Sequence, residues 1–395
     1  MITYGTEGDT RPLAALGHAL VQAGHAVELL GDVSTLGTAQ ALGLPSRALA
    51  GDIRATIAAE GAMSSIARNL ARLTMAHSGD WLRQAVDAGR ECDGLIVSGL
   101  AAFVGLSAGE ALKVPVIGTM LIPISPTAEF AAPFLPFTPP RVLNRSSHHV
   151  FNQLTWHLLR KATNRARADI GLPPRRSLWN QHPVLYGISP ALVPRPADWP
   201  ENARICGQWI PPLARTFTPD ASLLRFLDAG EPPIYVGFGS MAGFDNARLL
   251  DAVVGAIGDR RALFNAGWSG IDATRLPANF HAVGHVPHDW LLPRTAMAIH
   301  HGGSGTTHSA CRAGVPSIIV PFAGDQPFWA ARLRAAGIMA HTLKGATITA
   351  DRLARAIAHA DGSDARQRAA ALGARMRQED GCADAVRWVE RFARR

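Results

Sequence analysis

His300-His301-Gly302-Gly303-Ser304-Gly305-Thr306-Thr307 follows a short apolar segment, Ala296 to Ile299, and precedes a helical stretch that ends at Gly314. An apolar segment of this length is typical of a buried parallel strand, so the order is strand, glycine-rich turn, helix. Glycine lets the backbone approach a ligand closely, and the first N–H groups of a helix attract an anion. The stretch therefore predicts an α/β fold with a diphosphate site. The residues expected at the phosphates are His301, Gly303, Ser304, Gly305 and Thr306.

A polar pair follows the next apolar segment. Ser317 to Val320 is expected to be the neighbouring parallel strand, so Asp325 and Gln326 emerge from its carboxyl end, where open α/β sheets bind their ligands. A carboxylate beside an amide suits adjacent sugar hydroxyls. The alternative, an ordinary turn before a helix, would not need this pair. Phosphates from one loop and hydroxyls from the next indicate a nucleotide sugar.

These motifs resemble the donor signature of the GT-B, family-1 glycosyltransferases. The resemblance is to the branch that contains the sterol glucosyltransferases and the glycosyltransferases of glycopeptide and macrolide antibiotics. It spans nearly the whole chain, and further matching segments are Gly5–Pro12, Leu185–Pro196, Tyr235–Met241 and Val286–Leu291. The form Gly324–Trp329 is most similar to the sterol enzymes.

The resemblance implies two Rossmann-like β/α/β domains that face each other across a cleft. Residues 1–197 are expected to form an N-terminal acceptor-binding domain, and residues 198–219, rich in proline, a linker. Residues 220–378 would form the C-terminal nucleotide-sugar domain, and residues 379–395 a helix that crosses back to the first domain. Because the first strand, Ile2 to Tyr4, starts almost at residue 1, the completeness of that end stays open.

Asp9 is the candidate general base. It follows the first strand, so its carboxylate can take a proton from an acceptor hydroxyl. It can equally cap the helix expected to begin near Pro12, and the local sequence does not separate the two roles. The family resemblance, in which this aspartate is the usual candidate base, favours catalysis. Glu7 is a weaker rival, while His18 and His25 are expected to be structural.

Two further donor contacts are implied by the resemblance alone. Ser240 would donate to a phosphate, and Val286 would offer backbone groups to the nucleotide base. A turn that enters a short helix is an equally good reading of the segment at Val286. The resemblance favours UDP-glucose, but dTDP-sugars stay open, because Ser309 occupies the position at which plant-type relatives carry a ribose-binding glutamate.

No metal site is predicted. His300 and His301 are adjacent on an extended strand, so they point to opposite sides and cannot chelate one ion; His300 is expected to pack. The chain has no Asp-x-Asp motif, which argues against the metal-dependent transferase class. The helix start and His301 are then expected to stabilise the leaving diphosphate.

The acceptor site is expected in the first domain. Leu121 to Arg141 contains six prolines, which prevent regular helix, and three phenylalanines that need a cover. A hydrophobic acceptor would supply it; packing on the protein's own surface is the alternative. A helix from Phe151 to Ile170 follows. The candidate acceptor-binding residues are Phe130, Phe134, Phe137 and Trp156.

Composition agrees with a folded enzyme. The 395 residues are 47% hydrophobic and 18% charged, and no apolar segment approaches the roughly 20 residues that cross a bilayer. Four scattered cysteines without a CxxC motif fit the reducing cytoplasm. The net charge of +8 comes almost entirely from arginine, and we attribute it first to genome base composition rather than to binding. The alternative is that it favours an anionic nucleotide and a peripheral contact with an anionic membrane, whereas no motif indicates nucleic acid.

The sequence therefore predicts an inverting, metal-independent hexosyltransferase without a resident cofactor. It would move glucose from UDP-glucose, or another sugar from dTDP, to a hydroxyl of a sterol, polyketide, flavonoid or lipid. One alternative is a nucleotide-sugar epimerase of similar architecture. The other is a non-catalytic, donor-binding auxiliary protein. Acceptor identity and oligomeric state are not fixed by these motifs.

Overall fold

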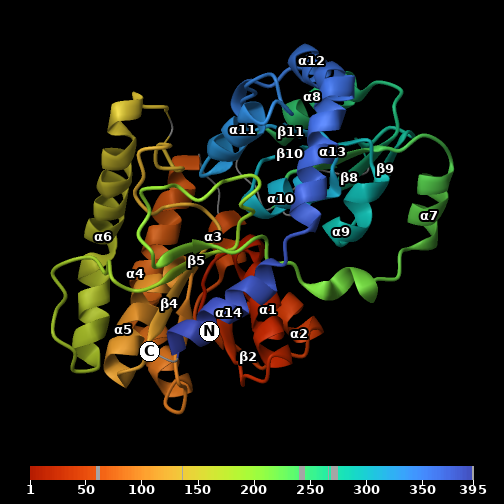
Figure 1. Ribbon diagram of the computed structural model, residues 1–395. Helices are drawn as coiled ribbons and strands as arrows, with labels where there is room; N and C mark the ends of the chain where they lie inside the picture. Colours follow the sequence, from red (N-terminus) through yellow and green to blue (C-terminus); the bar gives the residue numbers. More distant parts are fainter. Residues whose placement is uncertain (59–62, 136, 240–244, 266, 268–274, 394–395) are drawn as a thin grey trace. The chain divides into compact units, whose positions relative to one another are not determined.

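The computed structural model describes the whole chain except residues 59–62, 136, 240–244, 266, 268–274 and 394–395 (Figure 1). Two compact units share the chain. Unit 1 comprises Met1–Pro190, Pro194–Pro211 and Asp380–Arg395, and unit 2 comprises Ala191–Val193 and Pro212–Glu379. The C-terminal segment thus belongs to the same unit as the N-terminus.

Unit 1 contains parallel strands in two small sheets. The larger sheet has the order β3-β4-β5-β6, with bounds Leu95–Val97, Val116–Met120, Val184–Tyr186 and Ala203–Ile205. The smaller pairs β1 (Leu29–Asp32) with β2 (Ser46–Leu49). Ile2 forms single bridges to Leu30 and to Val97, one residue in each sheet. The expected first strand is therefore reduced to one bridging residue that links the two sheets.

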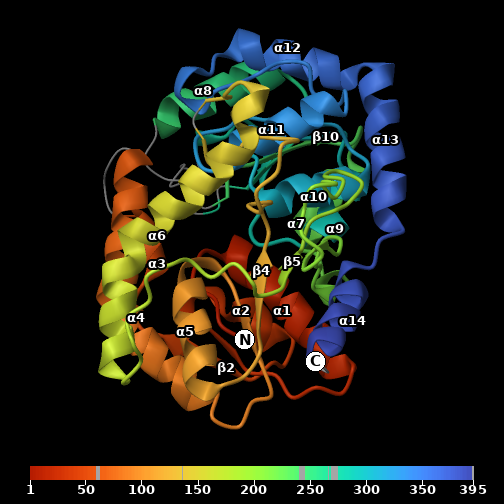
Figure 2. The same cartoon turned by 60° about the vertical axis from the view of Figure 1, so that its left-hand side comes forward.

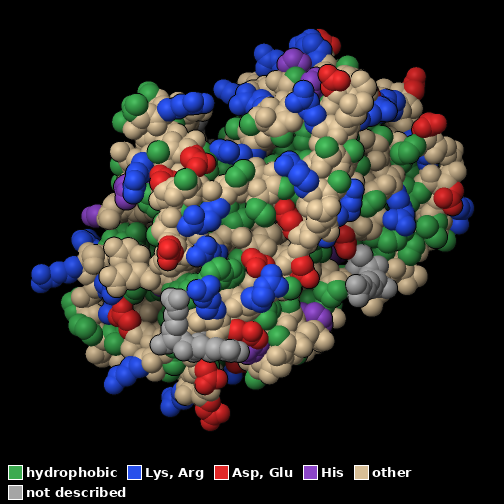
Figure 3. Space-filling view, in the orientation of Figure 1, with side chains coloured by type: hydrophobic (Ala, Val, Ile, Leu, Met, Phe, Trp, Pro, Cys, Tyr) green, Lys and Arg blue, Asp and Glu red, His purple; other side chains and the backbone are tan. Residues whose placement is uncertain are grey.

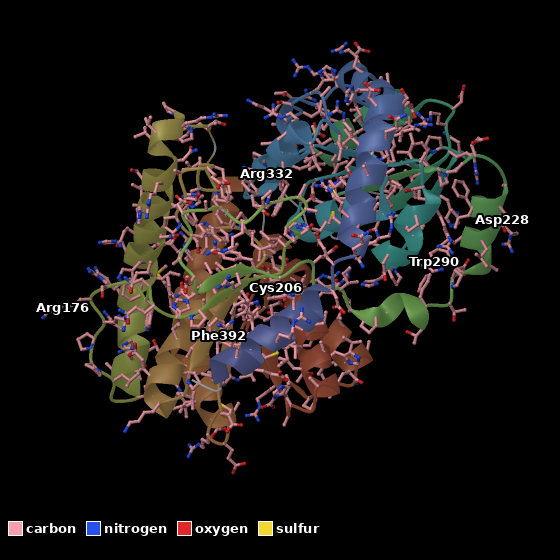
Figure 4. All side chains as sticks on the ribbon, viewed as in Figure 1. Arg176, Cys206, Asp228, Trp290, Arg332 and Phe392 are labelled. Atoms are coloured by element: carbon pink, nitrogen blue, oxygen red, sulfur yellow. The ribbon has the colours of Figure 1, made fainter. Side chains whose placement is uncertain are left out.

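The helices of unit 1 surround these sheets (Figure 2). They are α1 (Glu7–Gln22), α2 (Gly37–Ala41), α3 (Ile53–Ala58), α4 (Met63–Ala88), α5 (Ala102–Leu112), α6 (Asn144–Asp169) and α14 (Gly381–Ala393). Helix α6 packs on α4, and α14 packs on α1. Leu13 and Leu16 of α1 share one buried cluster with Cys206 and Val386, and Phe392 packs against it; Cys206 and Phe392 are labelled in Figure 4.

Unit 2 is a five-stranded parallel sheet in the order β11-β10-β7-β8-β9. The strand bounds are β7 Ile234–Gly237, β8 Ala262–Asn265, β9 Phe280–Ala282, β10 Met297–His300 and β11 Ser317–Ile319. The helices are α7 Ala221–Asp228, α8 Asn246–Ile257, α9 His288–Leu291, α10 Ser304–Ala313, α11 Gln326–Ala335, α12 Ala350–Asp361 and α13 Ser363–Arg377. Strand β10 is fully buried because it lies between β7 and β11.

The register of β10 positions the loops that matter here. His300, its last residue, pairs with Gly237 at the end of β7 and with Ile319 at the end of β11. Because the three strands are parallel and end at the same level, the segments that follow them leave the sheet side by side. The glycine-rich turn after β10 and the Asp325-Gln326 pair after β11 therefore belong to one edge of one sheet, as the sequence predicted.

Several sequence-based boundaries were wrong. Helix α1 begins at Glu7 rather than near Pro12, and α6 begins at Asn144 rather than at Phe151. The apolar residues that begin at Ile338 also predict a short strand, up to His341, but Ile338 and Met339 are buried within a loop. Apolar residues report burial, and a buried loop gives the same local pattern as a short strand.

Two global features complete the description. Over the described residues, no helix has the length and apolar character that crossing a membrane requires. All four cysteines, Cys92, Cys206, Cys311 and Cys382, are free thiols.

Candidate active site

The turn between β10 and α10 depends on two glycines. Gly302 has φ +95°, in the left-handed region, and a Cβ there would lie 2.4 Å from Ile319. Gly303 precedes the helix in an extended conformation, and a Cβ there would lie 2.5 Å from Nε2 of His301. Side chains at either position would therefore strain or push apart the turn. The glycines hold the backbone close to the His301 ring.

The start of α10 offers backbone donors. Its first intrahelical bond runs from the Thr307 N–H to the Gly303 carbonyl over 3.0 Å, and the Thr307 hydroxyl donates to the same carbonyl over 2.9 Å. The N–H groups of Gly305 and Thr306 precede that bond, so they lie outside the helix's own hydrogen bonding. Gly305 is exposed, and no atom lies within 4 Å of a Cβ built on it. The site has room for an anion at the positive end of the helix.

His301 lies beside these donors. Its ring contacts Gly303 on one side and Gly239 on the other, where a Cβ would come within 2.7 Å of Cε1. Burial lowers the pKa of His301 to about 4, against a smaller opposite effect of the Gly237 backbone. Its Nδ1 is buried and meets no partner of hydrogen-bond geometry among the described residues. At neutral pH this is a neutral imidazole, which can donate one hydrogen bond but carries no charge.

Two further histidines surround the turn. His300 is buried, and its Nδ1 accepts a hydrogen bond from the Gly302 N–H over 3.2 Å. Nδ1 of His308 donates to the Ser304 carbonyl over 2.7 Å. Burial lowers the pKa of His308 to about 4 and that of His300 well below its ordinary value. Both rings are thus neutral packing groups that brace the turn, the role expected for His300.

Asp325 and Gln326 begin α11, and each is already held by the protein. One carboxylate oxygen of Asp325 accepts the indole N–H of Trp329 over 2.5 Å. The amide oxygen of Gln326 accepts the N–H groups of Phe322 over 2.7 Å and of Ala323 over 3.1 Å. A ligand hydroxyl would therefore meet the Asp325 carboxylate as acceptor and the Gln326 amide nitrogen as donor.

Trp329 is the residue that motif reading missed as a functional group. It is fully buried, and the His308 ring meets it edge-on at 4.9 Å between centroids. It thereby links α10 to the carboxylate that begins α11. The spacing Asp325–Trp329 is one helical turn, which was a usable signal. Further along α11, Arg332 lies over the Phe328 ring at 4.9 Å (Figure 4).

Of the two other residues predicted to bind the sugar donor, Val286 and Ser240, the structure describes only Val286. Val286 is half-buried and packs against the apolar cluster that includes Tyr235 and Leu291. Trp290, labelled in Figure 4, packs against the same cluster. The short helix α9 begins two residues later, so the segment is a turn entering a helix, and its contact with a base stays a prediction. Ser240 lies outside the described residues.

In unit 1, Asp9 lies in the first turn of α1. One of its oxygens, Oδ2, accepts the Thr6 N–H over 2.8 Å and the Thr6 hydroxyl over 3.1 Å. A Cβ on Gly5 would lie 2.4 Å from the same oxygen, so glycine allows the backbone to pass close to the carboxylate. Asp9 therefore does cap the helix. Oδ1 makes no hydrogen bond with a described residue, and it is the atom available to a substrate.

The environment of Asp9 favours a base. Burial raises the pKa of the carboxyl, and the Thr6 hydrogen bonds oppose that rise. A raised pKa makes a carboxylate more basic, provided that it still ionises at working pH. The rival Glu7 forms a salt bridge with Arg11 over 2.5 Å. His25 is 3.3 Å from Glu390 of α14, a structural contact at the other end of the helix.

The four candidate acceptor residues do not form one cluster. Phe130 is buried edge-on to His148, and Phe134 stacks on Phe151 at 4.9 Å. Phe137 is 64% exposed, whereas Trp156 is 1% exposed. Trp156 packs edge-on to two aromatic rings, Phe103 and Trp179. A ligand has little of Trp156 left to contact, and the acceptor roles of all four stay predictions.

Comparison with known proteins shows which enzymes this chain is similar to. Residues 249–386 match the family described as "Erythromycin biosynthesis protein CIII-like, C-terminal domain". The chain is 31% identical to the sterol 3-beta-glucosyltransferase of Eremothecium gossypii, an alignment that covers 98% of this chain and 33% of that protein. It is 30% identical to the sterol 3-beta-glucosyltransferase UGT80A2 of Arabidopsis thaliana, over 98% of this chain and 64% of that protein.

Among solved structures, the glycotransferase of kitacinnamycin superimposes with a TM-score of 0.74 at 20% identity, over 99% of this chain and 97% of that one. The glycosyltransferase VinC, solved in complex with dTDP, gives a TM-score of 0.66 at 20% identity, over 100% and 98%. The chain is similar to the sterol 3-beta-glucosyltransferases over nearly its whole length, and it has the fold of these solved glycosyltransferases. The chain spans a third of the length of the Eremothecium protein and under two thirds of the length of the Arabidopsis protein. Its described residues contain no group of three or more histidine, cysteine, aspartate or glutamate side chains placed to hold a metal ion.

Proposed function

We propose that this protein transfers a hexose, with inversion and without a metal ion, from a nucleotide sugar to a hydroxyl of an apolar small molecule. The observation that carries the proposal is the edge of the unit 2 sheet. There the start of α10, the neutral His301 ring and the Asp325-Gln326 pair follow adjacent parallel strands. Groups that donate hydrogen bonds to phosphate follow one strand, and groups that bind hydroxyls follow the next. A nucleotide sugar has both a diphosphate and sugar hydroxyls, so it suits this edge.

In the proposed donor site, hydrogen bonds from neutral groups bind the diphosphate, rather than charged side chains. When the sugar leaves, negative charge grows on the diphosphate, and the N–H groups of Gly305 and Thr306 with the His301 ring would stabilise it. Asp325, fixed by Trp329, would orient the hexose. No resident cofactor is proposed, since the nucleotide sugar is consumed as a co-substrate.

The acceptor half rests on Asp9. Its Oδ1 would take the proton of the acceptor hydroxyl while the hydroxyl oxygen attacks C1 of the sugar from the face opposite the diphosphate. The C1–O bond to the phosphate then breaks with its electron pair going to the diphosphate, so configuration at C1 inverts. Because Asp9 is in unit 1 and the donor residues are in unit 2, turnover would require both units.

The choice of substrates follows from the relatives. Their names specify glucose transfer to a sterol, and VinC binds dTDP, so a nucleoside diphosphate donor and an apolar alcohol are the favoured pair. We propose UDP-glucose first and a dTDP-sugar second. Four free thiols favour a reducing cytoplasmic location. A membrane surface is the other partner suggested by the net charge.

The test has two arms. Calorimetry with UDP and dTDP measures the donor site alone. Mass spectrometry after incubation with UDP-glucose or dTDP-glucose and a panel of sterols, polyketides and flavonoids measures transfer. The proposal expects nucleotide binding and a product heavier by one hexose. Binding without transfer to any acceptor would favour the auxiliary protein. A new sugar formed from UDP-GlcNAc alone would favour the epimerase.

A further inference from the structure

Exposed apolar side chains concentrate in one short segment of unit 1. Among the described residues ten large hydrophobic side chains are exposed, and six of them lie between residues 137 and 158. Their exposed fractions run from 48% to 86%. The six are Phe137, Val142, Leu143, Val150, Leu154 and Leu158. Scattered exposed apolar residues need no explanation, but a concentration such as this one does.

Three of the six form a row along α6. Val150, Leu154 and Leu158 recur every four residues, so they lie on one side of the helix and span about 12 Å. The side of α6 that packs in unit 1 carries other residues, among them His148, Trp156, Leu159 and Thr163. The outer row therefore contributes nothing to the core, and water covers it in the isolated chain.

The charge around this row has one sign. Residues 130–168 contain six arginines and lysines and no aspartate or glutamate. Arg167 is buried in a 2.7 Å salt bridge with Glu110. The other five form no salt bridge with any described residue, and they are Arg141, Arg145, Arg160, Lys161 and Arg165. Lys161 and Arg165 follow Leu158 by three and seven residues, so they continue the side of the helix that carries the apolar row.

We propose that this surface, residues 137–143 with the outer side of α6, docks the protein on an anionic lipid membrane. An apolar row flanked by unpaired cations suits the boundary between acyl chains and phosphate headgroups, where the row is buried and each cation meets a phosphate. Figure 3 shows apolar and basic side chains next to one another at the amino-terminal end of α6, at the upper left.

The same charges oppose the other simple occupant, a second copy of this chain. In a symmetric dimer the surface would face itself, so the five cations of each copy would meet; residues 130–168 contain no carboxylate, and the nearby Asp198 interacts electrostatically with Arg145. A lipid surface supplies the missing anions. The inference does not rest on the proposed sugar transfer, because membrane binding is measured without donor or acceptor.

The experiment is flotation of the full chain with two kinds of vesicle. One is phosphatidylcholine alone, and the other contains 30 mol% phosphatidylglycerol. We expect binding to the anionic vesicles that is at least tenfold tighter than to the neutral ones and that is lost at high salt. Leu154→Glu with Leu158→Glu should weaken binding at least tenfold. Lys161→Glu with Arg165→Glu should do the same, since each cation near the surface is worth about fivefold.

The matched control is Val33→Glu, an equally exposed apolar side chain in the same unit, which should bind as the wild type does. Circular dichroism checks that every variant is folded; all four test positions are exposed, so folding should be retained. Failure to bind anionic vesicles would overturn the proposal, and so would binding that the α6 variants leave unchanged. A concentration-dependent dimer that Leu154→Glu dissolves would instead assign the surface to a second copy.

Discussion

The donor side of unit 2 and the acceptor side of unit 1 are built in opposite ways. On the donor side, the groups expected at the diphosphate and the hexose, Ser240 apart, lie within residues 301–326. Short-range contacts hold them: two glycines, the first turn of a helix and the Trp329–Asp325 hydrogen bond. On the acceptor side, Phe130, Phe134, Phe137 and Trp156 pack with different partners and differ in exposure from 1% to 64%. A donor site built from one contiguous segment can be the same in many related enzymes. An apolar acceptor surface built from distant loops can change from one enzyme to another.

The largest effect is expected at Asp9, where catalysis and helix capping meet. Asp9→Asn keeps an oxygen that accepts the Thr6 N–H but removes the base, so turnover should fall about 10³-fold with UDP affinity unchanged. Asp9→Ala loses the cap as well and should also cost about 1 kcal/mol of unfolding free energy. Kinetics, calorimetry and chemical denaturation measure the three quantities. Normal turnover in Asp9→Asn would leave this residue with capping alone.

The pH profile gives an independent view of the same residue. Because burial raises the pKa of Asp9, the carboxylate becomes protonated at a higher pH than an ordinary aspartate. kcat/KM should therefore fall as pH decreases through that raised value, and the acidic limb should be absent from the residual activity of Asp9→Asn. An unchanged acidic limb in the variant would assign it to another group.

The second effect tests whether the acceptor side is a core or a pocket. Trp156→Ala should cost about 3–5 kcal/mol of unfolding free energy, because it removes a buried indole packed against Phe103 and Trp179. Phe137→Ala, at an exposed position, should change stability by no more than about 0.5 kcal/mol. Urea denaturation checks both. If Trp156→Ala were as stable as the wild type and raised only the KM for acceptors, the contrast drawn here would fail.

The third prediction concerns Gly302 and Gly305 in the turn after β10, because a side chain would be strained at Gly302 but would fit at Gly305. Gly302→Ala places a side chain at φ +95° against Ile319, so it should destabilise unit 2 by about 1–3 kcal/mol. Gly305→Ala meets no atom within 4 Å and should leave stability unchanged. It should nevertheless weaken UDP binding about tenfold, because its methyl group occupies the space proposed for phosphate. Gly37→Ala, with equal room in unit 1, is the control for both measurements.

The smallest effect concerns the positioning of Asp325. Trp329→Phe keeps a ring against His308 but loses the indole N–H that the Asp325 carboxylate accepts, so the carboxylate that should orient the hexose is held less firmly. We expect kcat/KM for the nucleotide sugar to fall roughly tenfold with UDP affinity unchanged, since UDP has no hexose. Equal losses for UDP and the nucleotide sugar would mean that Trp329 supports the whole site rather than the sugar contact.

The same contrast explains what the sequence predicted. The segments after β10 and β11 were predicted to lie at one edge of the sheet because glycines, a helix start and a polar pair are contiguous signals with a direct physical meaning. The start of α1 was misplaced because Pro12 was read as the first turn, although Thr6 and Asp9 have the spacing of a capping box. The region of α4 was predicted only as alternating helical patches and loops, and α13 was not predicted. The role of Trp329 depends on a side-chain contact, and the separate partners of the four aromatic residues depend on long-range packing, neither of which a local pattern specifies.

The central claim is that the start of α10 binds the diphosphate of an activated hexose. The most direct measurement is a crystal structure of the protein soaked with UDP or dTDP. We expect both phosphates to lie against the backbone of Gly305 and Thr306, with the His301 ring within hydrogen-bond distance of a phosphate oxygen. A nucleotide bound elsewhere, with this turn unoccupied, would contradict it.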